Sequence, residues 1–146
     1  MTEEMPVRCG DYFFIPMKDD RFAVCQIIWM GSDRGKKFKN IFAFGVLSVG
    51  IDKNITEGGG YLSFKDHKDV FHVLFTAVDK LKSGEWPVLG AGEISDPSLE
   101  NFEFNMAGTL YRQGESVRVL PIEEYQNYLL LSVSGYELIE RFLQQY

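Results

Sequence analysis

The chain has 146 residues, a length typical of one domain, so we expect residues 1–146 to fold around a single set of packed layers. Its 45% hydrophobic and 25% charged residues exclude a disordered chain, and its 14% aromatic residues favour strands over a helical bundle. Fifteen basic against twenty-one acidic residues give a net charge of −6, which argues against a nucleic-acid partner.

Two apolar runs near the N-terminus predict a β-hairpin. Residues 11–17 and 21–30 are rich in β-branched and aromatic side chains, and three polar residues, Lys18, Asp19 and Asp20, join them. Both faces of the second run are apolar, with Ile27 and Trp29 expected on the same side. We therefore expect a hairpin that is covered on both faces or that meets a partner.

The middle of the chain predicts two further strands and an excursion. Residues 40–48 read as a third strand with Phe42, Phe44 and Val46 on one face. Residues 50–69 contain three consecutive glycines and many charges, which indicates a flexible excursion within the domain. The long apolar run over residues 70–79 predicts a central strand that crosses the core.

The C-terminal third predicts short strands followed by helices. Segments 102–104, 109–113 and 116–119 suit a barrel or a second sheet, and residues 121–128 suit a short helix. Ser134 and Glu137 have the spacing of a capping box, so an amphipathic helix should begin near Gly135. The expected fold is mainly β (α+β): a curved antiparallel sheet or small barrel with a C-terminal amphipathic helix.

The termini and cysteines predict a compartment. An acidic N-terminus and the absence of a run of about 18 apolar residues argue against export and against a membrane partner, so we expect a cytoplasmic protein. Pairing of the hairpin about its polar turn places Cys25 near Phe14 and away from Cys9, so a disulfide is not expected.

The sequence holds no recognised catalytic, phosphate-binding or zinc motif, so we expect no enzyme activity, no cofactor and no metal. His72 could act as a general base, but no Ser, Cys or carboxylate stands at a spacing that brings it close. A structural histidine is therefore the favoured interpretation.

Two short motifs carry a resemblance to a known family. Residues 10–17, Gly-Asp-Tyr-Phe-Phe-Ile-Pro-Met, precede the acidic turn and the strand at 20–28, and residues 81–90, Leu-Lys-Ser-Gly-Glu-Trp-Pro-Val-Leu-Gly, follow much later. In this order they resemble the immunity protein 26 family over about residues 8–125. The resemblance implies a bacterial immunity protein, an inhibitor that binds and neutralises a cognate toxin domain of a polymorphic toxin system. An acidic inhibitor would suit a basic nuclease toxin.

Exposure and chemistry suggest where such a partner binds. The candidate contact residues are the carboxylates at the hairpin end and the residues around the later turn: Asp11, Asp19, Asp20, Asp79, Glu85 and Trp86. One alternative is a small-molecule-binding or hydrolytic β domain with His72 in a pocket beside Asp79 or Glu85. Another is a nucleic-acid adaptor that uses the basic loop at residues 34–39. The oligomeric state stays open.

Overall fold

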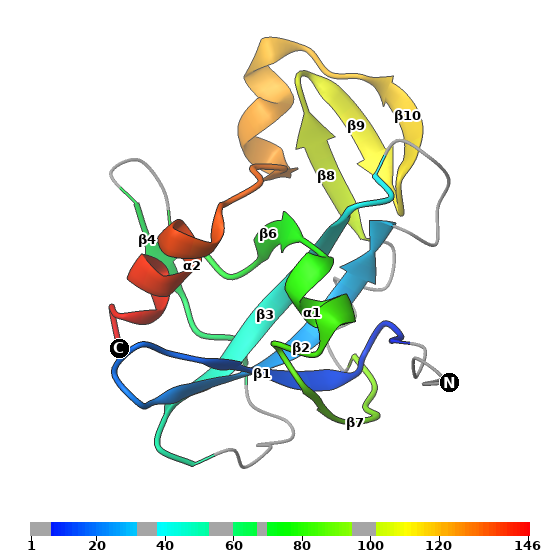
Figure 1. Ribbon diagram of the computed structural model, residues 1–146. Helices are drawn as coiled ribbons and strands as arrows, with labels where there is room; N and C mark the ends of the chain where they lie inside the picture. Colours follow the sequence, from blue (N-terminus) through cyan, green and yellow to red (C-terminus); the bar gives the residue numbers. More distant parts are fainter. Residues whose placement is uncertain (1–6, 32–37, 53–59, 67–69, 95–101) are drawn as a thin grey trace.

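The structure, a computed structural model, describes residues 7–31, 38–52, 60–66, 70–94 and 102–146. As the sequence predicts, it is mainly β with largely antiparallel sheets and a C-terminal helix (Figure 1). The larger sheet has the order β6-β3-β2-β1-β7 and, in the described residues, does not close into a barrel. Its strands are β1 (Tyr12–Pro16), β2 (Phe22–Met30), β3 (Ile41–Gly50), β6 (Leu74–Ala77) and β7 (Val88–Gly90).

A second sheet and several short elements complete the fold. The second sheet has the order β10-β9-β8-β11 and contains β8 (Glu103–Met106), β9 (Thr109–Arg112), β10 (Glu115–Val119) and β11 (Leu129–Leu130). The remaining elements are the ladder of β4 (Phe64–Lys65) with β5 (Val70–Phe71), the helices α1 (Asp79–Ser83) and α2 (Tyr136–Leu143), and a 3-10 helix, η3 (Ile122–Asn127). The predicted second sheet is thus present, and the predicted helix at 121–128 is of the 3-10 type.

The predicted hairpin is confirmed. β1 and β2 pair antiparallel, and Cys25 lies opposite Phe13, one position from the predicted neighbour Phe14. Both cysteines are free thiols, with Cys25 fully buried and Cys9 exposed. Burial disfavours the thiolate and raises the pKa of Cys25 well above its ordinary value.

A β-bulge in β2 changes which face two side chains occupy. Ile27 lies opposite Phe44 and Trp29 lies opposite Ala43, so Ile28 is an extra residue in the ladder. Ile27 packs in the first hydrophobic core, whereas Ile28 and Trp29 both pack in the second. The expectation that Ile27 and Trp29 share a face is therefore wrong, because simple alternation does not continue through a bulge.

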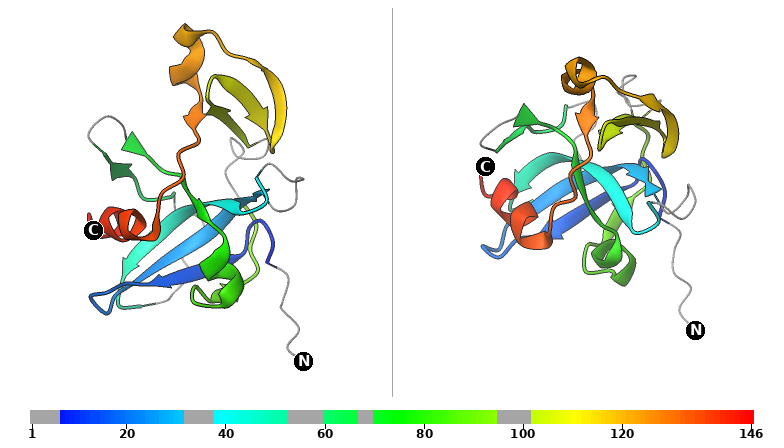
Figure 2. Two further views of the ribbon diagram at one scale, coloured as in Figure 1. Left: turned by 45° about the horizontal axis from the view of Figure 1, so that its top comes forward. Right: turned by 90° about the horizontal axis from the view of Figure 1, so that it is seen from above.

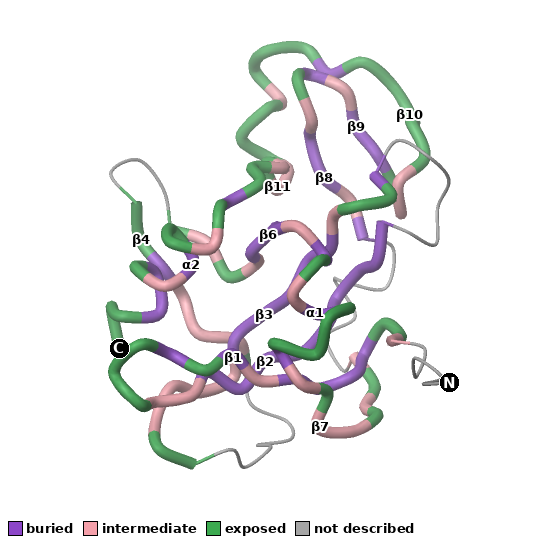
Figure 3. The backbone as a smooth tube through the Cα atoms, in the orientation of Figure 1, coloured by how far each residue is buried: buried purple, intermediate pink, exposed green. Residues whose placement is uncertain are grey.

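The two cores cover opposite faces of the larger sheet. In the first core, Phe13, Phe42 and Phe44 pack with side chains of α1 and α2. In the second, Trp29 packs with Phe104 of the second sheet. Figure 3 shows β2 and β3 as the most continuously buried part of the chain, whereas β10 is exposed along its length. Figure 2 shows the second sheet standing over one end of the larger sheet.

The prediction of a central strand over residues 70–79 is wrong. The run is divided into β5 and β6, with exposed His72 between them, and β6 forms an edge of the larger sheet. A single parallel bridge between Phe75 and Val133 accompanies that edge. Apolar composition alone did not distinguish a central strand from an edge strand that other segments cover.

The C-terminal helix is confirmed, but its predicted capping box does not form. The N-cap is Gly135, one residue later than expected, and no side chain caps the helix. Ser134 instead uses its backbone in tertiary contacts: its N–H donates to the Phe75 carbonyl (2.8 Å) and its carbonyl accepts from the Thr76 hydroxyl (2.7 Å). The amphipathic pattern holds, because Ile139, Phe142 and Leu143 are buried.

A polar contact fixes the middle of β2 to two loops. Gln26 is buried, its Nε2 donates to the carbonyls of Gly10 (3.0 Å) and Glu93 (3.1 Å), and its Oε1 accepts from the Tyr61 hydroxyl (2.7 Å). The Tyr61 ring lies directly over Gly45, where an added Cβ would come within 2.4 Å of ring carbons. Glycine at position 45 is therefore required by the close approach of this ring.

We expect Gly45→Ala to lower the free energy of unfolding by about 1–3 kcal/mol, because the Tyr61 ring must move away from the methyl group. Gly50→Ala is the matched control in the same strand, since no atom lies within 4 Å of its Cβ position, and its change should stay within about 0.5 kcal/mol. Urea unfolding of both variants measures the difference. Equal stabilities would contradict the packing of Tyr61 on β3.

Candidate functional site

The β1–β2 turn presents Asp19 and Asp20 to solvent, as predicted, but its charges are balanced locally. Asp20 has a positive φ of 67°, and both aspartates are exposed. Arg21 forms an ion pair with Asp19 at 2.8 Å, and Arg21 Nη1 also donates to the Tyr146 carbonyl. The hydrogen bond from the Arg21 side chain lowers the pKa of Asp19. With Lys18 adjacent, the turn carries two carboxylates and two cations.

Helix α1 has the same balance. Asp79 and Glu85 are exposed, as predicted, but Lys80 lies 3.9 Å from the Glu85 carboxylate and Lys82 is exposed beside them. Lys80 also lies over the Tyr136 ring, 4.5 Å from its centroid. Neither the β1–β2 turn nor the α1 region is therefore a concentrated acidic surface.

Two of the predicted contact residues are buried. Trp86 is 4% exposed, and its ring packs against Phe13, Phe44 and Tyr136 at centroid distances of 6.0, 6.1 and 5.4 Å. Asp11 is 8% exposed, and its Oδ2 accepts from the Arg8 N–H at 2.9 Å. We therefore correct both predictions: Trp86 anchors the first core and Asp11 closes a local turn, so neither offers a contact surface.

The alternative based on His72 is not favoured by the geometry. His72 is exposed, and its Nδ1 lies 3.3 Å from the Tyr61 carbonyl. The cavity described below is lined by residues on either side of His72 in the chain, but not by His72, Asp79 or Glu85. The basic loop of the second alternative lies largely outside the described residues, which include only Phe38 and Lys39 of its length.

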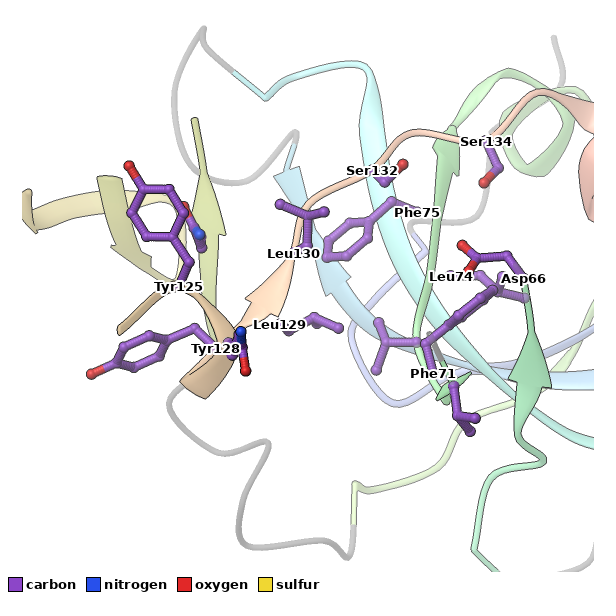
Figure 4. A pocket seen from close by; sticks show the side chains of 14 residues that line it. Asp66, Phe71, Leu74, Phe75, Tyr125, Tyr128, Leu129, Leu130, Ser132 and Ser134 are labelled. Atoms are coloured by element: carbon purple, nitrogen blue, oxygen red, sulfur yellow. The ribbon is translucent and has the colours of Figure 1, made fainter. Parts of the chain in front are cut away.

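A groove with a volume of about 740 Å³ lies between the two sheets (Figure 4). One wall comes from β5 and β6, the other from η3, β11 and the segment that leads to α2. The apolar residues of the lining are Val70, Phe71, Val73, Leu74, Phe75, Leu129 and Leu130, and the polar ones are Asp66, Asn105, Tyr125, Gln126, Tyr128, Ser132 and Ser134. Its size falls in the range of ligand-binding sites, about 300–1,000 Å³.

Several apolar side chains around this groove are open to solvent. Val70 is 59% exposed and Leu130 is 57% exposed, and Val133, which lies between two lining residues, is 50% exposed. An exposed apolar patch with a polar border marks an interaction site in many soluble proteins. We therefore take the groove, named here the intersheet groove, as the candidate functional site.

The sequence interpretation missed this site. It assigned residues 121–128 to a short helix and gave no role to the run Tyr128, Leu129, Leu130 and Leu131, although four apolar or aromatic residues in succession after a polar helix are a signal of partial burial. No local pattern could show that this run would lie beside residues 70–75, because the pairing depends on the parallel contact between β11 and β8.

Comparison with known proteins adds no relative: no family model, curated protein or solved structure matches this chain. In the described part of the chain, neither α-helix is long and apolar enough to cross a membrane.

We expect Arg21→Gln to raise the pKa of Asp19 toward the ordinary value of 3.8, because the variant removes the side-chain hydrogen bond and the positive charge beside the carboxylate. Carboxyl carbon shifts, followed by NMR through acid titration, measure this pKa. Lys18→Gln is the matched control: Lys18 directly precedes Asp19, and among the described residues only its backbone N–H is hydrogen-bonded, to Glu140. A pKa that shifts equally in both variants would assign the effect to general charge and not to the Arg21 contact.

Proposed function

We propose that the chain is a bacterial immunity protein, which binds a cognate toxin domain in the cytoplasm and neutralises it. Two lines of support are independent of each other. The first is the resemblance of residues 10–17, 20–28 and 81–90 to the immunity protein 26 family. The second, which carries the proposal, is the exposed apolar lining of the intersheet groove on an acidic chain.

Inhibition of this kind needs binding and no chemistry by the inhibitor. A protein that covers a toxin's active site or its substrate-binding surface blocks it by exclusion. An apolar groove can enclose the few large apolar or aromatic side chains that carry most of the binding energy of a protein complex. The net charge of −6 supplies long-range attraction to a basic partner such as a nuclease toxin.

In this proposal Asp19, Asp20, Asp79 and Glu85, which do not line the groove, act through their charge. All four are exposed, and Asp19 and Glu85 have cations within ion-pair distance, so each contributes little fixed binding energy. Their effect is on the rate of encounter, which depends on the field in front of the surface.

A second candidate is a small-molecule-binding domain that uses the same groove. The groove volume of about 740 Å³ and its mixture of aromatic and hydroxyl-bearing side chains favour it. This candidate predicts that a small ligand binds in the groove when no protein partner is present.

Co-expression with the toxin domain encoded beside this gene tests the immunity proposal. We expect the intact chain to restore bacterial growth and Leu130→Asp to lose that protection, because a carboxylate on the groove wall must be desolvated when a partner binds. Ile51→Asp is the matched control: Ile51 is also exposed, at 78%, but does not line the groove. Death of cells that contain both proteins in soluble form would reject the pairing, and rescue by Leu130→Asp would move the contact elsewhere.

The role of the hairpin-turn charges is tested by Asp19→Lys with Asp20→Lys. We expect this double variant to lower the association rate with the purified toxin about fivefold at low salt, with little change in the dissociation rate, and the difference should shrink as salt is added. Stopped-flow fluorescence measures both rates. Glu115→Lys with Glu137→Lys changes the net charge by the same amount at exposed sites outside the turn and serves as the control. Equal slowing by both doubles would show that only net charge matters.

A further inference from the structure

We propose that Phe142, Gln145 and Tyr146 form a latch that holds the β4–β5 ladder in place, and that release of this latch opens the intersheet groove while both larger sheets stay folded. The inference concerns a wall of the groove and not its occupant, so it goes beyond the proposed function and does not depend on it. Three features carry it: the isolation of the ladder, the contacts of the latch, and the groove residues that the ladder contributes.

The first feature is that the ladder has little support of its own. β4 and β5 form a two-stranded sheet with two residue pairs, Phe64 with Phe71 and Lys65 with Val70, and within the described residues this sheet joins neither larger one. The neighbouring wall strand β6, by contrast, pairs with β3 over its whole length. A two-stranded ladder is marginally stable by itself. Its position therefore depends on contacts with other elements.

The second feature is that the Gln145 side chain acts on β4 as an adjacent strand would. Its Oε1 accepts from the Lys65 N–H (3.0 Å), and its Nε2 donates to the Lys65 carbonyl (2.8 Å). The Tyr146 hydroxyl donates to the Ser63 carbonyl, one residue before β4. Figure 1 shows the C-terminal residues beside β4 accordingly. All three hydrogen bonds lie at exposed positions, where water competes for the same groups, so they break without global unfolding.

Aromatic contacts complete the latch. The Phe142 ring meets the Phe71 ring of β5 with centroids 5.0 Å apart, and the Tyr146 ring meets the Phe64 ring of β4 at 5.5 Å. Both pairs have edge-to-face geometry, which favours aromatic contact. Because Phe64 is fully buried, the closed arrangement is the dominant one, and the latch sets how rarely it opens.

The third feature is that the ladder contributes to the groove. Val70 and Phe71 line it, and so does Leu74, which is only 2% exposed (Figure 4). Phe71 packs against the first core, which includes Leu74. Movement of β5 away from β6 therefore uncovers Leu74 and widens the groove on this side.

Amide hydrogen exchange of the full chain, followed by NMR, tests the latch. We expect Gln145→Ala to speed exchange of the Phe64 and Phe71 amides about fivefold, because the open state loses fewer hydrogen bonds in the variant. Gln144→Ala is the matched control: Gln144 is also exposed, but its side chain donates to Glu140 on α2. The amides of Ile27 and Phe44, paired in the larger sheet, report global unfolding and should not change.

A dye tests whether release of the latch opens the groove. Anilinonaphthalene sulfonate is an anionic dye that binds exposed apolar surface, and we expect Gln145→Ala to raise its fluorescence about twofold. Adding Leu130→Asp, a like charge on the opposite wall, should remove that increase, whereas adding Ile51→Asp, outside the groove, should keep it. Circular dichroism establishes that each variant is folded.

Three results would each overturn the inference. The first is exchange of the Phe64 and Phe71 amides that is equal in Gln145→Ala and Gln144→Ala. The second is an equal acceleration of the Ile27 and Phe44 amides, which would assign the effect to global stability. The third is a dye signal that Leu130→Asp does not reduce. None of these measurements uses a toxin, so failure of the co-expression test would leave the latch standing, and loss of the latch would leave the immunity proposal standing.

Discussion

Burial of β2 on both faces is the constraint on which the rest of the structure depends. One face packs Cys25 and Ile27 against aromatic side chains of the first core, and the bulge at Ile28 turns Trp29 into the second core. A strand buried on both sides needs two covering layers. The helices with the β4–β5 ladder supply one layer, and β8 and β9 supply the other. Loss of either would expose a row of large apolar side chains.

The intersheet groove follows from this arrangement. The second sheet covers only one end of the larger sheet, and the chain then returns along η3 and β11 to reach α2 (Figure 2). That return passes the edge strand β6 with one bridge, at Phe75 and Val133, and does not continue as a ladder. Two edges that pair at one bridge alone leave a space, and its walls carry core side chains such as Phe75 together with exposed ones such as Leu130.

The exposed charges and the apolar groove lie on different parts of the molecule, whereas the sequence interpretation placed acidic and aromatic residues in one contact surface. Two of the acidic residues have basic neighbours within ion-pair distance: Asp19 has Arg21, and Glu85 has Lys80. Exposed pairs of this kind contribute little fixed binding energy, and their charges act mainly on the rate of encounter with a partner. In the proposed function, the apolar groove supplies the contact area and the exposed charges supply the attraction, as hot spots and rim charges do in protein complexes.

The sequence by itself determined the fold class, the first hairpin, the third strand, the short C-terminal strands and the amphipathic helix, because each depends on the period of apolar residues or on turn residues close in the chain. It did not determine where β6 lies, that Trp86 and Asp11 are buried, or that Ser134 serves as a tertiary contact in place of a helix cap. It also gave no sign of the groove, whose two walls come mainly from residues 66–75 and 125–134. Those outcomes depend on which sheet edges meet, and only the tertiary structure decides that, because long-range packing competes with and overrides local preference.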